Sequence, residues 1–478
     1  MQLFRLLYKC AFAVPFVAGL SLIIGCNKLL DAGEPDNKVV TPQVYKSDSL
    51  AQAAVIGVYT RMMERFGPHN GYMTRFPGLS CDELFPSSTP LTQDQPFLIN
   101  ALPSNNNIIW QIWTLTYAYI YQCNDLVEGL TGANSITPAL RDQLLGEAYF
   151  LRAFSYFYLV NQYGDVPLVL STDYTKSANI ARTPVSDVYV QMIEDLTEAQ
   201  SLLPNSYVTT PEFPAARVRV NRLAVKALQA RIHLYRKEWT LAAAAASEVI
   251  ESGIYQLETD LSQTFRYNSR EAILQFMPVL DAYNTAEGGL FVPVNPNGRP
   301  TFILCDSILK YMEPADKRKT WVRTVTVSGK QYNSPYKYKL NSGTPREEYN
   351  MVLRLAEQYC IRAEARAMLD QLPEAVNDLN TIRKRAGLAD LANITTQTRA
   401  IAAVEQERRI ELFAEWGHRW FDLKRWPASR PTHPDEKRID EVMNALRPAT
   451  WKNTAAFWPI PSTEFIRNPA LTQNEGYN

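Results

Sequence analysis

The stretch EQERRIELFAEWGHRWFDLKRW, residues 405–426, concentrates five acidic residues, five Arg or Lys residues, one His and three Trp. Paired carboxylates could act as general acid and base, but the spacing fits a helix, with Glu405 and Glu415 each four residues before an arginine (Arg409 and Arg419). Such ion pairs stabilise a helix by about 0.5 kcal/mol when exposed. We therefore predict a helix that fastens the C-terminal region to the rest of the chain and carries no catalytic residue.

Motifs of known catalytic or metal centres are absent from the sequence. There is no P-loop, no Rossmann glycine fingerprint, no HExxH and no GxSxG. The four His stand far apart and the later cysteines include no CxxC pair, so neither a metal site nor a cofactor is predicted. An oxidising compartment would permit a disulfide among Cys81, Cys123, Cys305 and Cys360, with three possible connectivities, but we expect buried free thiols. Glycoside hydrolysis stays open, because two carboxylates suffice for it.

The N-terminus is typical of a bacterial lipoprotein signal. Arg5 and Lys9 precede an apolar stretch that is shorter than the roughly 20 residues needed to span a bilayer, and a glycine stands directly before Cys26. We predict a signal peptide over residues 1–25, a lipidated Cys26 and a polar tether over 26–41. The membrane would then be bound through the lipid anchor only.

The remainder is predicted to be mainly α-helical and to form one domain, residues 42–478. Lys plus Arg and Asp plus Glu both number 49, so no net charge attracts a nucleic acid, and none is expected as partner. Apolar residues recur at helical spacing in several stretches. These are residues 47–66, 110–130, 137–164, 183–204, 221–253 and 352–388.

The last two stretches are predicted to be helical hairpins, because small residues allow close packing and a short turn interrupts each of them. The turns are expected near residues 237–239 and at Leu372-Pro373. Paired helices of about 34 residues suggest tetratricopeptide-like pairs that form a scaffold. Two segments rich in Pro, Gly and Asn, about 84–108 and 262–346, interrupt this pattern and are where we expect the ligand-binding half, with a short strand at TWVRTVTV.

Several stretches, in order along the chain, carry a family resemblance: WTLTYAYIYQCND, EAYFLRAFSYFYLVNQYGDVPLV, NGRPTF, VLRLAEQYCIRAEA, LNTIRKRAGL, ERRIELFAEWGHRWFDLKRW and FWPIPSTEFIRNPALTQNEGY. Together they resemble the SusD/RagB family of outer-membrane nutrient-binding lipoproteins. The resemblance covers essentially the whole mature chain, and the lipoprotein signal agrees with it. Departures are modest: Cys360 stands where the family often has Leu, and Trp416 where it often has Gly.

The resemblance implies a helical fold with an irregular ligand-binding half and no catalytic activity. It implies a protein that is lipid-anchored in the outer membrane of a Gram-negative bacterium and faces the cell surface. This protein would capture an oligosaccharide or another nutrient. The ligand would pass to a partner TonB-dependent transporter of the SusC type. The alternatives are a glycoside hydrolase and a tetratricopeptide-like lipoprotein that binds a peptide or another nutrient.

Family ligand residues do not fall within the shared motifs, so candidates come from chemistry. Sugar rings stack on exposed aromatic faces, while amides, carboxylates or guanidinium groups bind their hydroxyls. Trp110 follows three asparagines at a loop–helix junction, and the other candidates lie in the two loop-rich segments. The predicted ligand-binding residues are Phe97, Asn105, Trp110, Tyr283, Arg299 and Trp321.

Overall fold

The computed structural model describes residues 41–208, 217–280, 283–431 and 435–477. The predicted signal peptide, Cys26 and all but the last residue of the predicted tether lie outside these ranges. Among the described residues, no helix is long and apolar enough to cross a membrane.

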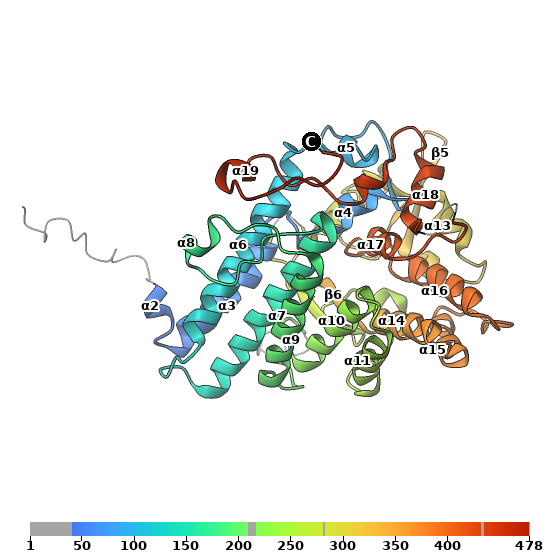
Figure 1. Cartoon of the computed structure of the whole chain (residues 1–478). Coiled ribbons are helices and arrows are strands. Elements are labelled where there is room, and N and C mark those ends of the chain that lie inside the picture. Colours follow the sequence, from blue (N-terminus) through green and yellow to red (C-terminus); the bar gives the residue numbers. More distant parts are fainter. Residues whose placement is uncertain (1–40, 209–216, 281–282, 432–434, 478) are drawn as a thin grey trace, which may run out of the picture.

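Long helices lie side by side and form the larger part of the fold (Figure 1), which confirms the predicted mainly α-helical class. α6 packs against α3 and α7, α7 against α9, α9 against α10, α10 against α11 and α14, and α14 against α15 and α16. Their bounds are α3 Asp48–Met63, α6 Asn107–Leu130, α7 Pro138–Tyr163, α9 Val185–Leu202, α10 Arg222–Tyr235, α11 Trp239–Glu251, α14 Leu355–Met368, α15 Leu372–Arg385 and α16 Gln397–Glu411.

Local sequence signals set the ends of these helices. The side chains of Ser47, Asn106 and Asn221 accept hydrogen bonds from backbone N–H groups in the first turns of α3, α6 and α10. α7 begins at Pro138 and ends before Gly164, whose φ of 74° few other residues adopt. These are the boundaries that the sequence predicts, to within a few residues.

The two predicted helical hairpins are confirmed. α10 and α11 are joined across Arg236–Glu238, where Lys237 has a φ of 60°, and α14 and α15 are joined across Leu369–Gln371, where Asp370 has the same value. Leu372-Pro373, predicted as the second turn, instead opens α15, because proline suits the first turn of a helix. Buried alanines allow the close packing of the pairs, as expected for tetratricopeptide-like helices.

Many short elements lie at the upper right of this array in Figure 1, whereas α2, α8 and α19 lie at its left. The predicted strand is confirmed as β4, which pairs antiparallel with β5 through a turn at Ser328 and Gly329, both at positive φ. β1 pairs with β3 and β2 with β6, also antiparallel. The strands are β1 Leu84–Pro86, β2 Ala272–Phe276, β3 Phe302–Leu304, β4 Val322–Val327, β5 Lys330–Pro335 and β6 Asn350–Arg354. The short helices are α2 Thr41–Val44, α4 Tyr72–Ser80, α5 Gln95–Leu98, α8 Tyr174–Ser177, α12 Ala286–Phe291, α13 Asp306–Tyr311, α17 His418–Arg425, α18 Arg438–Leu446, α19 Glu464–Arg467, and the 3-10 turns η2 Leu261–Gln263, η3 Lys317–Trp321 and η4 Asn453–Ala456.

The prediction of one continuous helix over residues 405–426 is wrong. α16 ends at Glu411, and α17 begins at His418 after a turn in which Ala414, Trp416 and Gly417 all have φ between 47° and 71°. Tertiary contacts hold this turn: Trp416 donates its backbone N–H to Thr74 and its indole N–H to the carbonyl oxygen of Met351 at 2.6 Å.

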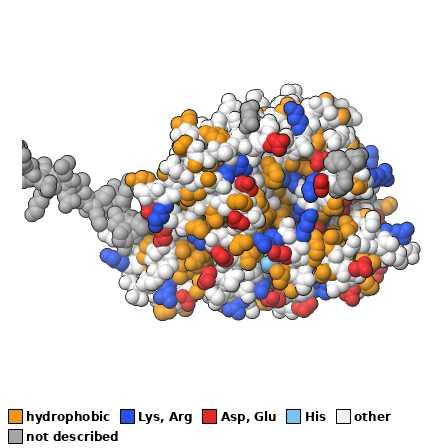
Figure 2. Space-filling model, in the orientation of Figure 1, with side chains coloured by type: hydrophobic (Ala, Val, Ile, Leu, Met, Phe, Trp, Pro, Cys, Tyr) orange, Lys and Arg blue, Asp and Glu red, His pale blue; other side chains and the backbone are white. Residues whose placement is uncertain are grey.

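The predicted free thiols are confirmed at all four cysteines, of which only Cys305 is partly exposed. Acidic and basic side chains are interspersed on the face of the molecule shown in Figure 2. This mixture agrees with the balanced charge of the sequence.

Candidate functional site

The charged C-terminal run is a buried clamp, and its arginines do not form the predicted helical pairs. Arg409 and Arg419 both bind the carboxylate of Asp82, at 2.7 and 2.9 Å. Glu415 instead binds Arg354 at 2.8 Å. The partner Asp82 lies more than 300 residues away in the sequence, which is why helical spacing could not identify it. The predicted role in fastening the C-terminal region holds, through different contacts.

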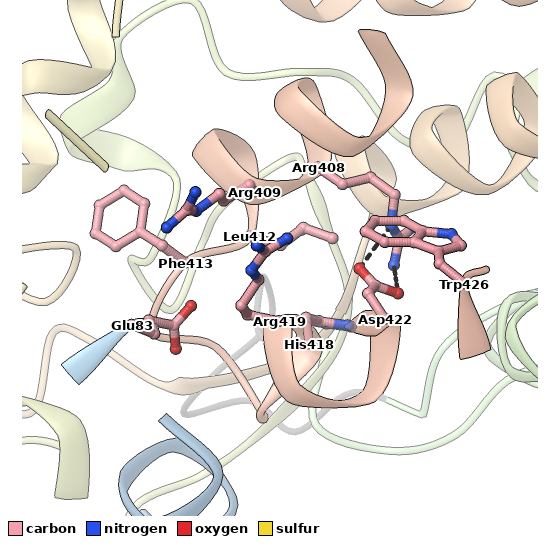
Figure 3. Close-up of a pocket in the computed structure, with 9 residues that line it drawn as sticks. All are labelled: Glu83, Arg408, Arg409, Leu412, Phe413, His418, Arg419, Asp422 and Trp426. Atoms are coloured by element: carbon pink, nitrogen blue, oxygen red, sulfur yellow. Dashed lines mark hydrogen bonds and ion pairs between the residues drawn. The ribbon is translucent and has the colours of Figure 1, made fainter. Parts of the chain in front are cut away.

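A cavity lies within this clamp, lined by residues from both sides of the turn and by Glu83 (Figure 3). The carboxylate of Asp422 accepts two hydrogen bonds from Arg408, at 2.9 and 3.0 Å. Burial raises the pKa of Glu83 to about 7. The space between these side chains has no room for a water molecule, whereas ligand pockets typically measure roughly 300–1,000 Å³. The cavity is therefore part of the packing of the clamp.

Trp321 is not a ligand platform, because it has no exposed surface. Its indole N–H donates to the carbonyl oxygen of Leu261 at 3.1 Å, and its ring lies against three buried cations, with Lys337 Nζ 4.9 Å from a ring centroid. The other two cations are Arg354 and Arg385. The ring therefore covers a buried ionic network.

Phe97 is likewise fully buried, which removes it as a platform. Its ring packs 4.5 Å from that of Phe76 and 5.1 Å from that of Trp458. Phe97 lies in the segment that we predicted to be rich in loops. However, it belongs to the short helix α5, which directs this side chain into the core.

Two half-buried rings, Phe66 after α3 and the predicted residue Tyr283, lie in contact, and a third half-buried ring, Tyr72, stands at the start of α4. We call these three residues the aromatic cluster. Phe66 and Tyr283 meet edge to face with centroids 5.5 Å apart. The hydroxyl of Tyr72 donates to Oε1 of Gln111 at 3.3 Å, which joins the cluster to the first turn of α6.

Two glycines bring the backbone close beneath these rings. At Gly289 in α12, a Cβ atom would lie 2.4 Å from the Tyr283 ring, so only glycine lets that ring rest on the helix. Gly71 has a φ of 88°, and a Cβ there would lie 3.1–3.3 Å from Phe66 and α12. The cluster is thus a preformed surface that joins the segment after α3 to α12.

Two side chains between Phe66 and Tyr72, those of His69 and Asn70, hold the backbone of this segment. Asn70 donates to the carbonyl oxygens of Met63 and Arg65 at 2.9 and 3.1 Å. His69 is buried among aromatic rings, including those of Phe154 and Trp416, and this burial lowers its pKa to about 3. At physiological pH the imidazole is therefore neutral, and its packing among these rings helps to hold the segment in place.

The other predicted residues differ in their exposure. Trp110 is half-buried in the first turn of α6, directly before Gln111. Asn105 is exposed in the loop that precedes this helix. Arg299 is exposed beside Pro300, whose carbonyl oxygen accepts a hydrogen bond from Ser87. Among the described residues, neither Asn105 nor Arg299 bonds to the cluster.

Phe66 and Tyr72 were missed because the segment was assigned to a helix through Phe66. The signal that could have identified them is the sequence FGPHNGY, in which two glycines and a proline end α3 and open a loop between two aromatic residues. α3 in fact ends at Met63, three residues earlier than predicted.

The chemistry of the cluster is that of binding. Half-exposed rings offer apolar faces, Gln111 offers an amide, and Arg65 and Glu64 stand beside them with side chains 55% and 47% exposed. Glu287 of α12 is buried beneath, and its carboxylate accepts hydrogen bonds from Thr74 and Asn350 at 3.0 and 3.2 Å. Among the described residues, no three His, Cys, Asp or Glu side chains are grouped to hold a metal ion.

Two family models match the chain. Residues 306–477 match the model described as "SusD family", and residues 91–234 match the one described as "Starch-binding associating with outer membrane". A SusD-like protein of Formosa agariphila is 23% identical over 96% of this chain and 97% of its own length. A SusD-like protein of Bacteroides ovatus is 24% identical over 88% of this chain and 83% of its own length.

Solved structures share the fold. A SusD superfamily protein of Bacteroides vulgatus superimposes with a TM-score of 0.76 at 19% identity, over 90% of this chain and 99% of its own. The surface glycan-binding protein A of Bacteroides uniformis gives a TM-score of 0.72 at 22% identity, over 89% of this chain and 99% of its own. Similarity at this identity establishes the architecture only.

Proposed function

The chain belongs to the SusD/RagB family, and from that premise we propose that it binds an oligosaccharide through the aromatic cluster. It is a binding protein and not an enzyme. Its relatives are named SusD-like, and one structural neighbour is named a surface glycan-binding protein. The observation that carries the proposal is the edge-to-face pair of Phe66 and Tyr283, half-exposed on a backbone fixed by two glycines and a buried histidine.

The chemistry of the cluster supports a sugar ligand. The apolar faces of pyranose rings stack on aromatic side chains, and hydroxyl groups need amide or charged partners beside them. Gln111, Arg65 and Glu64 supply such partners. Trp110, half-buried in the first turn of α6, is proposed as a further aromatic contact, and Asn105 and Arg299 as further polar contacts.

The location and the partner complete the proposal. The protein is anchored at the outer membrane by lipid on Cys26, after removal of residues 1–25, and it faces the cell surface. Residues 42–478 act as one domain that passes the ligand to a TonB-dependent transporter of the SusC type. The description of the second matching family model, which names association with the outer membrane, supports this location.

A calorimetric titration with defined oligosaccharides tests the binding site. The probes are hexasaccharides of α-glucan, β-glucan, xylan, mannan and galactan, and the protein is compared with Tyr283→Ala and Trp110→Ala. Loss of one stacked ring should weaken the best ligand by about tenfold, since aromatic contacts are worth roughly 1 kcal/mol or more beyond burial. Both variants should unfold at nearly the wild-type temperature.

Tyr121→Ala is the matched control, because it removes a tyrosine ring that is 53% exposed elsewhere on α6. It should leave the affinity unchanged. Equal affinities for the wild type and the Tyr283 and Trp110 variants would place the ligand elsewhere. Release of smaller sugars from any probe would instead establish hydrolysis.

A further inference from the structure

Four large apolar side chains stand exposed on one face of the molecule, which we call the outer α6 face: Tyr121, Leu170, Tyr174 and Ile466. Ile466 and Tyr174 are 86% and 78% exposed, and Tyr121 is 53% exposed. Single exposed apolar residues are ordinary, but a group of them indicates a contact surface. Orange side chains are visible in Figure 2 over the part of this face formed by α8 and α19.

Hydrogen bonds show that these residues are neighbours. The segment 167–172 runs along α6: Tyr117 donates to the carbonyl oxygen of Pro167 at 2.8 Å, and Asn124 to that of Val169 at 3.0 Å. Thr172 donates its backbone N–H to Glu128 at 3.0 Å. Tyr121 lies between the first two of these helix positions, Leu170 follows Val169 in the segment, and α8 with Tyr174 comes shortly afterwards.

α19 borders the same face. Asn468, directly after α19, donates to the carbonyl oxygen of Ile180 at 2.7 Å. Glu464 of α19 lies close enough to Tyr117 to help raise the pKa of that phenol, although burial is the main cause. Ile466 is therefore carried to the margin of the α6 surface.

The N-terminal end of the described chain is fastened to this same helix. Tyr45 donates its hydroxyl to the Asp125 carboxylate at 2.8 Å, and its ring lies so close to Gly129 that a Cβ there would be 2.0 Å away. The chain toward Cys26 thus leaves beside the outer α6 face. Tyr45 is nineteen positions after Cys26, and a chain of this length reaches at most about 65 Å.

The composition of this face suits a lipid headgroup layer. Tyrosine places an apolar ring beside a polar hydroxyl, and such residues gather where membranes meet water. Two cations border the face, with the side chains of Lys176 and Arg467 exposed by 72% and 63%. Each pairs with a neighbouring acid, but exposed ion pairs are weak and leave the cations free to bind anionic headgroups.

We propose that the outer α6 face lies against the anionic headgroup surface of the membrane that holds the protein. This proposal rests on the proposed lipid anchor at Cys26 and adds to it a second, weaker contact. The contact orients the domain, so that the opposite end of the helix array extends away from the membrane.

Hydrogen–deuterium exchange on the full chain tests this orientation. The processed protein is reconstituted in vesicles of phosphatidylethanolamine and phosphatidylglycerol and is compared with the Cys26→Ser chain in buffer. Backbone amides over residues 170–178 and 464–468 should exchange about threefold or more slowly on the vesicles. The double variant Tyr174→Asp, Ile466→Asp should float with the vesicles but lose this protection.

Val294→Asp is the matched control, since Val294 is 84% exposed on a different segment, and this variant should keep the protection. If the wild-type protein floats with the vesicles but its amides show no protection, the proposal is wrong, while the lipid anchor is still supported. Protection that arises only on native outer membranes also overturns it, and assigns the face to a protein partner. A wild-type chain that does not float overturns both the anchor and the proposal, while calorimetry with the hexasaccharides judges sugar binding separately.

Discussion

At the scale of single residues, the two tryptophans predicted as sugar platforms have different environments. Trp110 is half-buried at a helix start, whereas Trp321 is fully enclosed and covers three cations. Both stand beside loop-rich sequence, so composition could not separate them. The difference lies in the ionic network beneath Trp321, whose members are scattered along the chain.

Replacement of Trp321 by Ala should lower the free energy of unfolding by about 3–5 kcal/mol. The change opens a large cavity and exposes the buried cations to it. Trp110→Ala should cost far less, because part of that ring already contacts water. Urea unfolding of both variants measures the difference. Equal costs would show that Trp321 is not part of the core.

Glu83 makes stability depend on pH. Its pKa of about 7 exceeds the ordinary value of 4.5, so the folded chain holds a proton that the unfolded chain releases. The contribution of this carboxyl group to the free energy of unfolding is therefore complete below pH 4.5. It is lost as the pH rises from 4.5 through 7. Glu287 and Glu348, whose pKa values burial also raises to about 7, act in the same direction.

Glu83→Gln should remove the loss of stability that ionisation of Glu83 causes, because glutamine cannot ionise. The variant should match the wild type near pH 4.5 and become more stable than it by up to about 3 kcal/mol at pH 8. Urea unfolding at several pH values measures the gap. Glu64→Gln, which removes a half-exposed carboxylate, is the control. A gap for Glu83→Gln that does not widen with pH contradicts the assignment.

At the scale of elements, the sequence predicted helices well where apolar periodicity and caps agree. α7 and the two hairpins follow from Thr137-Pro138, Gly164 and the alanine-rich pairs. The turn between α16 and α17 did not follow, because Ala414 and Trp416 have no local preference for positive φ. Contacts of Trp416 with α4 and β6 impose it, and those partners are more than 60 residues away.

The same limit applies to the candidate site. Tyr283 and Trp110 were predicted from their places in a loop-rich segment and at a loop–helix junction, and in the structure both are half-buried. Phe66 and Tyr72 were missed because helical periodicity was continued past Met63. Their grouping with Tyr283 depends on how α12 meets the segment after α3, and no local pattern encodes that contact.

Gly417 gives a test of this imposed turn. It has a φ of 71°, and a Cβ there would lie 2.8 Å from the carbonyl oxygen of Met73 in α4. Gly417→Ala should therefore cost the backbone strain of positive φ and, in addition, about 1–3 kcal/mol for overpacking. Gly132→Ala is the control, since its φ is 74° and nothing lies within 4 Å of its added Cβ. The difference in urea midpoints isolates the contact, and equal midpoints would contradict it.

At the scale of the whole molecule, a buried ionic network connects the helix array to the irregular half. Arg354, at the end of β6 and the start of α14, binds Glu271, Glu411 and Glu415 at 2.6–2.8 Å. Glu271 precedes β2, and the other two acids flank the end of α16. One guanidinium thus binds three carboxylates, from two parts of the chain, that are 57 to 83 residues away.

Arg354→Met should therefore destabilise the molecule as a unit. Loss of the cation leaves buried carboxylates short of partners, which costs about 3–5 kcal/mol, whereas intact buried pairs add little net stability. Arg270→Met, which removes a cation with a 53% exposed side chain that pairs with Glu258, should cost less than about 1 kcal/mol. Calorimetry should show one shifted transition for Arg354→Met, because the network spans both halves of the fold. Two separate transitions would show that the array and the irregular half unfold independently.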